Sequence, residues 1–164
     1  MSCLVADAPR APLDLLAAQH EDWIVQQAIT LLEQRLFKDR SPLDGPAAAC
    51  EYLRLKLVSA PNEIFAAVFL DSRHQVLAFE QLFSGTVDGA DVYPRVVLQR
   101  ALVHNATSLI LAHQHPSGCT TPSDADRRIT LRLRDALAMI DVRILDHFII
   151  GKGKPYSFAE SGLL

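Results

Sequence analysis

Two histidines separated by one residue are the first group in this sequence that could bind a metal. His113 and His115 follow the apolar run 108–112 and precede Pro116. On an extended chain their side chains point to one face, roughly 6.5–7 Å apart, which lets two imidazoles bind one ion. Pro116 disfavours helical backbone at His115 and so favours the extended form. The alternative is a strand that simply ends in two polar residues facing solvent.

An aspartate on the apolar side of a helix is the second candidate. After Pro122 the apolar residues recur at helical spacing to about Ile140, and Asp126 falls on the same stripe. A carboxylate facing the core is costly unless it is paired or binds a metal. Ser123 permits another interpretation, in which it forms a capping box with Asp126 at the start of the helix. Both interpretations fit the sequence.

A glutamate on a predicted strand is the third candidate. Glu80 lies in the stretch 75–83 and shares the alternating face of Val76, Ala78 and Leu82. The simpler explanation is that this is the wetter side of a hairpin, where an edge charge deters aggregation. Two histidines on one face, an inward aspartate and an inward glutamate are nevertheless the components of a catalytic zinc site.

These residues together predict the hydrolysis of an amide bond. His113, His115 and Asp126 as ligands of one Zn²⁺ per chain would leave a fourth position for water, whose pKa the metal lowers toward ~7. Glu80 would take the proton of this water as general base and deliver it to a leaving amine. Ser123 would donate a hydrogen bond to the oxyanion that develops on the attacked carbonyl. Nitrogen and oxygen ligands without thiolate suit zinc, and iron or manganese would also fit.

Hydrophobic spacing predicts the elements that must position these groups. The order is helix, hairpin, helix, strand, helix and strand, which is typical of an α/β fold with one shared core. We therefore expect a helical N-terminal extension over residues 1–40 and a catalytic domain over residues 41–164. The predicted helices span 22–38, 47–57, 93–104 and 123–140, and the predicted strands span 63–71, 75–83, 108–112 and 142–150.

Composition narrows the classes of function. The chain has 164 residues and a net charge of −3, so it has room for about one domain and lacks a strongly basic body. Its three cysteines are an odd number and do not suggest a disulfide framework. The longest apolar run, 64–70, is far shorter than the ~20 residues of a membrane helix. We expect a cytoplasmic protein without a membrane partner.

The spacing of the candidate residues resembles a known metalloprotease motif. His113-x-His115 is followed after seven residues by Ser123 and after two more by Asp126, with Glu80 upstream. This pattern is similar to the JAMM motif of the JAB/MPN superfamily, in which relatives cleave isopeptide bonds to ubiquitin-like tails. The resemblance implies a zinc ion on the two histidines and the aspartate, with help from the glutamate and the serine.

Several longer runs resemble the RadC branch of this superfamily more narrowly. They are LILAHQHPSG, PSDAD, LDHFIIG, FEQLFSGT and VYPR. The resemblance covers about residues 41–164 and implies a JAB/MPN-type mixed sheet sandwiched by helices, acting on a peptide or protein substrate. Val96 departs from the pattern, because a glutamate often follows VYPR in RadC sequences.

A second hypothesis is a DNA-associated protein with a structural or vestigial metal site. Longer RadC proteins place a helix-hairpin-helix module ahead of this domain, and residues 1–40 do not resemble one, which weakens the link to DNA repair. The predicted helix after Pro122 nevertheless has a basic face that could contact nucleic acid. That face consists of Arg127, Arg128, Arg132 and Arg134. The oligomeric state is left open.

Overall fold

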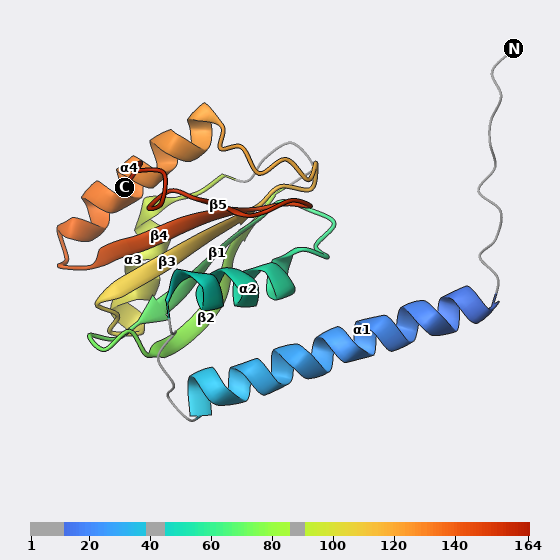
Figure 1. Cartoon of the computed structure of the whole chain (residues 1–164). Helices are drawn as coiled ribbons and strands as arrows, with labels where there is room; N and C mark the ends of the chain where they lie inside the picture. The colour runs from blue at the N-terminus through green and yellow to red at the C-terminus, as the bar shows by residue number, and fades with distance from the viewer. Residues whose placement is uncertain (1–11, 39–44, 86–90) are drawn as a thin grey trace, which may run out of the picture.

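A five-stranded sheet forms the centre of the molecule (Figure 1). The structure is a computed structural model that describes residues 12–38, 45–85 and 91–164, with side chains described for residues 20–37 in the first of these segments. The strand order is β2-β1-β3-β4-β5, and only β3 and β4 run parallel to each other. The strands are β1 (Ile64–Leu70), β2 (Val76–Ser84), β3 (Ser108–Gln114), β4 (Arg143–Ile150) and β5 (Tyr156–Ser157).

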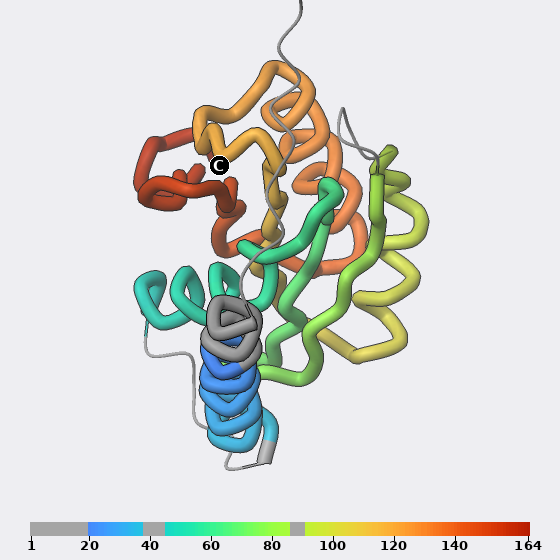
Figure 2. The backbone as a smooth tube through the Cα atoms, turned by 90° about the vertical axis from the view of Figure 1, so that its right-hand side faces the viewer, coloured from blue at the N-terminus to red at the C-terminus, as the bar shows by residue number. Residues whose placement is uncertain are grey.

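The central strands are buried on both faces because helices cover the sheet from both sides (Figure 2). All residues of β1 and β3 are buried, as expected for unbroken apolar runs inside a sandwich. Helices α3 (Pro94–Val103) and α4 (Asp124–Ala138) cover one face. The other face is covered by α2 (Pro46–Leu57) and by the end of α1 (Pro12–Glu33) with its π-helical turn, η1 (Gln34–Lys38).

Alternate residues of β1 divide the core into two halves. Phe65 and Ala67 pack with Leu133 and Leu137 of α4, whereas Ala66 and Val68 face the side of α2. Strand β4 follows α4 and lies parallel to β3, so α4 is the crossover connection that parallel strands require. The ends of β3 and β4 therefore lie at the same edge of the sheet.

The predicted α/β fold with a mixed sheet between helices is confirmed. All four predicted helices and all four predicted strands are present, and the short β5 was not predicted. The first helix begins at Pro12 rather than near residue 22. The C-terminal end of this helix packs against the rest of the domain, because Leu36 of η1 belongs to the hydrophobic core beneath α2. The predicted boundary after residue 40 falls within 39–44, which lie outside the described residues, and it stays a prediction.

None of the helices within the described segments is long and apolar enough to cross a membrane.

Candidate metal centre

The two histidines lie where three strands come together at one edge of the sheet. His113 is the second-to-last residue of β3 and pairs with Phe65 of β1. The amide of His115 donates a hydrogen bond of 2.9 Å to the carbonyl of Ile150, at the end of β4. Because β1 runs antiparallel to β3, Glu63, the residue before β1, reaches the same edge and shares its face with Phe65.

Four side chains gather there, two imidazoles and two carboxylates. Nδ1 of His113 lies 2.7 Å from Oδ1 of Asp126, and Nε2 of His115 lies 3.5 Å from Oδ2 of the same carboxylate. Nε2 of His113 contacts the carboxylate of Glu63. Glu63, His113 and His115 each offer a ligand atom, and these atoms lie within 4.8 Å of one another.

This donor set fits a metal such as zinc. Asp126 is 2% exposed, His113 6% and Glu63 8%, so two carboxylates are buried in contact with the imidazole of His113. Buried carboxylates need compensating partners or a cation, and a mixture of imidazole and carboxylate suits Zn²⁺. The predicted ligands His113, His115 and Asp126 are thus brought together, and Glu63 joins them as an additional candidate.

Asp126 is held rigidly at the start of α4. Its Oδ2 accepts hydrogen bonds from the backbone amide of Ser123 at 2.7 Å and from the Ser123 hydroxyl at 2.6 Å, and its own amide donates to Ser123 Oγ at 3.1 Å. The capping box is therefore present, and it coexists with the contacts to the histidines. Burial acts to raise the pKa of Asp126, but hydrogen bonds from His113, His115 and Ser123 outweigh burial and hold it far below its usual range. Asp126 is ionised at neutral pH.

A backbone contact orients His115. Its Nδ1 lies 2.9 Å from the carbonyl oxygen of Cys119, which can only accept, so Nδ1–H is the donor. In the neutral ring this hydrogen bond leaves the lone pair on Nε2, the nitrogen that faces Asp126. In the protonated ring, which the hydrogen bond to Asp126 favours by raising the pKa of His115, Nε2–H donates to that carboxylate. Metal-binding histidines are commonly fixed in this manner, because the second ring nitrogen donates to a carbonyl or carboxylate.

The loop that follows His115 rests on the end of β4. The amide of Gly118 donates to the carbonyl of His115 at 3.0 Å, and the amide of Lys152 donates to the carbonyl of Gly118 at 3.1 Å. A Cβ atom on Gly151 would come within 2.5 Å of the Gly118 oxygen. Glycine at position 151 is therefore what allows the loop to approach β4 so closely.

Glu80 does not join this group, and its predicted place beside the histidines is wrong. Its carboxylate accepts hydrogen bonds from Nε of Arg100 at 2.7 Å and from a terminal nitrogen of the same guanidinium, and it contacts Nε2 of His104 at 2.7 Å. Hydrogen bonds from Arg100 and His104, opposed by partial burial, lower the pKa of Glu80. Glu80 shares its face with Ala78 and Leu82 as predicted, whereas Val76 lies on the other face because a register shift separates it from Ala78. The partners of Glu80 on that face come from α3 and its C-cap.

The sheet register explains why Glu63 rather than Glu80 reaches the histidines. Glu80 of β2 pairs with Ala67, whereas His113 pairs with Phe65 on the other side of β1. Strand spacing then places the Cα atoms of Glu80 and His113 roughly 12 Å apart. Glu63 was not among the residues predicted for the site, although it lies directly before an apolar strand and on the same face as Phe65.

Two further buried polar residues, Thr130 and His147, form hydrogen bonds next to Asp126. The Thr130 hydroxyl donates to the Asp126 carbonyl at 2.6 Å and lies 2.7 Å from Nδ1 of His147, which must therefore be the donor in that contact. Burial lowers the pKa of His147 to about 3, so its ring is neutral. The ring stacks on Phe158. The structural, hydrogen-bonded role expected for a buried histidine therefore fits His147.

Other sites singled out from the sequence lie elsewhere. The four arginines of α4 are exposed, and Arg134 is paired with Asp135 at 3.1 Å, so the predicted nucleic-acid face stays a prediction.

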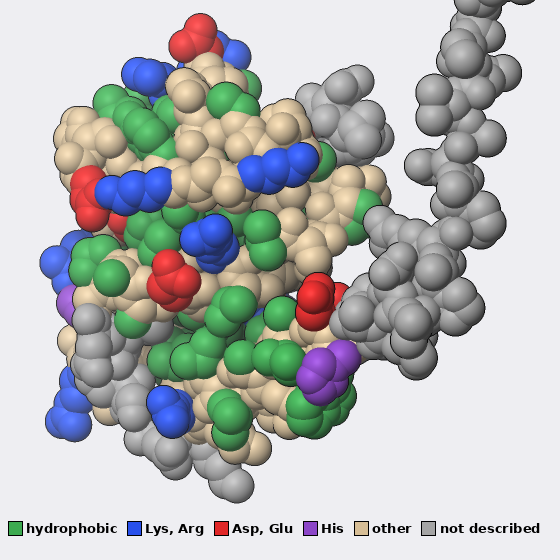
Figure 3. Space-filling view, turned by 45° about the vertical axis from the view of Figure 1, so that its right-hand side comes forward, with side chains coloured by type: hydrophobic (Ala, Val, Ile, Leu, Met, Phe, Trp, Pro, Cys, Tyr) green, Lys and Arg blue, Asp and Glu red, His purple; other side chains and the backbone are tan. Residues whose placement is uncertain are grey.

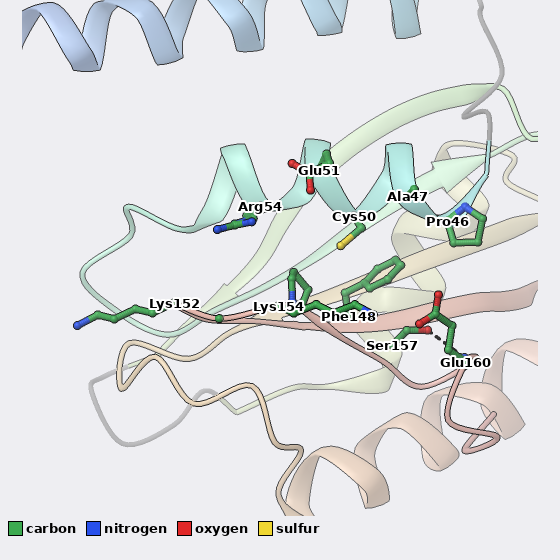
Figure 4. A pocket seen from close by; sticks show the side chains of 12 residues that line it. Pro46, Ala47, Cys50, Glu51, Arg54, Phe148, Lys152, Lys154, Ser157 and Glu160 are labelled. Atoms are coloured by element: carbon green, nitrogen blue, oxygen red, sulfur yellow. Dashed lines mark hydrogen bonds between the residues drawn. The ribbon is translucent and has the colours of Figure 1, made fainter.

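On the α2 side, a cleft of about 630 Å³ lies between α2 and the loop after β4 (Figure 4). Cys50, Arg54 and Lys152 line it, and none of the four metal-centre residues does.

A mixed sheet between two helical layers, with a His-x-His strand end and two buried carboxylates at its edge, defines a JAB-type domain. The chain belongs to the RadC-like JAB domain family, whose model matches residues 43–163.

Similar proteins are known from several bacteria. The chain is 57% identical over 133 residues to a UPF0758 protein of Azotobacter vinelandii, covering 81% of this chain and 59% of that protein. It is 57% identical over 131 residues to a UPF0758 protein of Stutzerimonas stutzeri, covering 80% and 58%. With a UPF0758 protein of Halorhodospira halophila it shares 50% over 143 residues, covering 85% and 64%. The chain thus spans less than two thirds of each relative.

Proposed function

We propose that this chain is a zinc-dependent hydrolase that cleaves an amide bond in a peptide or protein substrate. The observation that carries the proposal is the meeting of His113, His115, Asp126 and Glu63 at one buried edge of the sheet. Within the described segments, Glu63, His113 and His115 form the group whose ligand atoms lie close enough to share an ion, and Asp126 contacts both histidine rings. Membership of the JAB family supports the same chemistry.

In this proposal His113, His115 and Asp126 hold the zinc ion. Asp126 is the carboxylate that contacts both rings, and it is kept ionised and fixed by Ser123. His115 already presents Nε2 because its Nδ1–H is occupied by the Cys119 carbonyl. When bound, the zinc ion would supply a Lewis acid that polarises a carbonyl and lowers the pKa of a water toward ~7.

Glu63 takes the role of general base that was predicted for Glu80. Its carboxylate lies against Nε2 of His113, so an oxygen atom of Glu63 is within reach of a water at the histidine pair. The carboxylate would accept the proton of the attacking water and return it to the leaving amine nitrogen. Glu80 cannot do this, because Arg100 and His104 hold its carboxylate beneath α3.

Ser123 acts on Asp126 in this arrangement. Its single hydroxyl proton is donated to Oδ2 of Asp126, so it does not point to a substrate carbonyl. We therefore assign Ser123 to the positioning of the ligand, and its predicted contact with an oxyanion would require that hydrogen bond to be exchanged. An exchange of this kind costs about one hydrogen bond, ~1 kcal/mol.

Metal content and hydrolysis, measured on the same preparations, test this proposal. We expect one zinc per chain and cleavage of at least one member of a panel of peptide and isopeptide substrates. Glu63→Gln should keep the zinc and lose the activity, whereas Glu80→Gln should keep both. A folded protein that takes up no zinc when zinc is supplied would contradict the proposal, and so would full activity of Glu63→Gln.

A further inference from the structure

The first helix carries apolar side chains that the body of the protein does not cover. Residues 20–27 of α1 are all exposed, and this part of the helix extends beyond the edge of the body (Figure 1). Trp23 is 56% exposed, Ile24 50% and Leu31 55%. Figure 3 shows hydrophobic side chains gathered with a histidine and an acidic side chain where the coloured part of this helix begins. Exposed apolar clusters of this kind mark interaction surfaces.

Helical spacing separates two apolar stripes on α1. Ile29, Leu32 and Leu36 face the body, and Ile29 and Leu36 are both 7% exposed. Ile24, Ala28 and Leu31 recur at steps of four and three residues and form a second stripe, about 100° around the helix from the first. We call Ile24, Ala28 and Leu31 the outer stripe. In the part of the chain that the structure describes, no other element packs on it.

Charged residues at the two ends of the outer stripe indicate what covers it. Glu21 and Arg35 are both exposed, and Ala28 lies midway between them, seven residues from each. If two copies of α1 cross antiparallel at Ala28, Glu21 of each copy lies opposite Arg35 of the other. A parallel pair would instead place Glu21 against Glu21 and Arg35 against Arg35, which is unfavourable.

The same twofold arrangement satisfies the apolar residues. Ile24 of one copy comes opposite the turn of the other copy that carries Leu31, and the small side chain of Ala28 permits close approach at the crossing point. A surface that is complementary to itself about a twofold axis is what a closed homodimer requires.

We propose that the protein forms an antiparallel homodimer through the outer stripe of α1. The dimer goes beyond the proposed hydrolase activity and does not depend on it, because the outer stripe is separate from the metal centre in the fold. The contact is one helix long, so the association is expected to be concentration-dependent and weaker than that of obligate dimers.

Sedimentation velocity of the full chain over a concentration series tests the dimer. We expect a monomer–dimer equilibrium that Ile24→Asp and Leu31→Asp each abolish. Leu102→Asp is the matched control, because Leu102 is also an exposed leucine on a helix, 62% exposed on α3. It should leave the equilibrium unchanged. Circular dichroism verifies that each variant retains its helices.

Charge reversal tests the antiparallel register. Glu21→Arg or Arg35→Glu alone places like charges together at both ends of the twofold contact, and should weaken the dimer by roughly tenfold. The double variant Glu21→Arg/Arg35→Glu restores opposite charges and should return the dissociation constant to near its original value. A double variant that associates no better than the single variants would overturn the antiparallel pairing.

Two further outcomes would overturn the dimer itself. One is a protein that stays monomeric at every concentration, and the other is a dimer that Ile24→Asp does not affect. A native chain that stays monomeric but dimerises on deletion of residues 1–11 would assign the outer stripe to that segment instead.

Discussion

Oδ1 of Asp126 lies 2.7 Å from Nδ1 of His113, while the other oxygen of the same carboxylate is held by Ser123. The carboxylate is thereby fixed between the start of α4 and the end of β3. We expect Asp126→Asn to lower zinc affinity by about 100-fold or more, since it removes the charge of the proposed ligand while keeping the size of the side chain. Titration with a chromophoric zinc chelator measures this.

Asp124→Asn provides the control for that substitution. Asp124 also lies in the first turn of α4 and is exposed, so it shares the helix end without sharing the site. The zinc affinity of the Asp124→Asn variant should equal that of the native chain. Equal affinities in both variants would exclude Asp126 as a ligand and leave Glu63, His113 and His115 as the ligand set.

The close contact between Gly118 and Gly151 gives a second prediction. In Gly151→Ala the new Cβ would lie 2.5 Å from the Gly118 oxygen, so the loop after His115 must move. We expect the free energy of unfolding to fall by about 1–3 kcal/mol, as in other overpacked sites. Zinc affinity should fall as well, because His115 begins that loop. Gly153→Ala, which meets no atom within 4 Å, should change neither quantity.

Glu80 should contribute to stability and leave the metal unaffected. Glu80→Gln weakens a partly exposed cluster with Arg100 and His104, so we expect the free energy of unfolding to fall by about 1 kcal/mol. Urea unfolding of the native and variant chains measures the difference. The zinc content should remain at the native value, and its loss would return Glu80 to the metal centre.

The buried ring of His147 should make the zinc-free protein sensitive to acid. Its pKa is lowered to about 3 in the folded state, whereas an unfolded histidine titrates near 6.5. Between these values the unfolded chain binds a proton that the folded chain does not, so stability is present above pH ~6.5 and is lost as the pH falls toward 3. The loss reaches at most ~1.4 kcal/mol per pH unit for this group.

Denaturant unfolding at several pH values, with chelator present, checks the contribution of His147. His147→Gln removes the titrating ring and keeps an amide that can bond to Thr130, so its stability should depend less steeply on pH between 6.5 and 3. Parallel pH profiles for the native and variant proteins would show that other groups cause the acid sensitivity.

The parts of the site that the sequence predicted are those encoded by local spacing. His113 and His115 lie on one face because a strand alternates, and Asp126 faces inward because a helix repeats about every 3.6 residues. These relationships need no knowledge of the partners in the fold. The apolar runs predicted the four longer strands for the same reason.

The predictions of site residues failed where the position of a side chain depends on pairing between strands that are distant in the sequence. Glu63 joins the site only because β1 lies antiparallel to β3 in one register, and 50 residues separate it from His113. Glu80 was predicted on an apolar face, which is correct, but spacing along β2 does not show which helix covers that face. The partners of Glu80 are Arg100 of α3 and His104, the C-cap residue of that helix.

The distance along the chain between Glu63 and His113 also affects how the protein would fold. A metal centre assembled from the start of β1, the end of β3 and the start of α4 does not exist until the central sheet has paired and the crossover helix has docked. Ion binding would therefore favour the whole native domain over partly folded forms, and would add its free energy to global stability instead of to one loop.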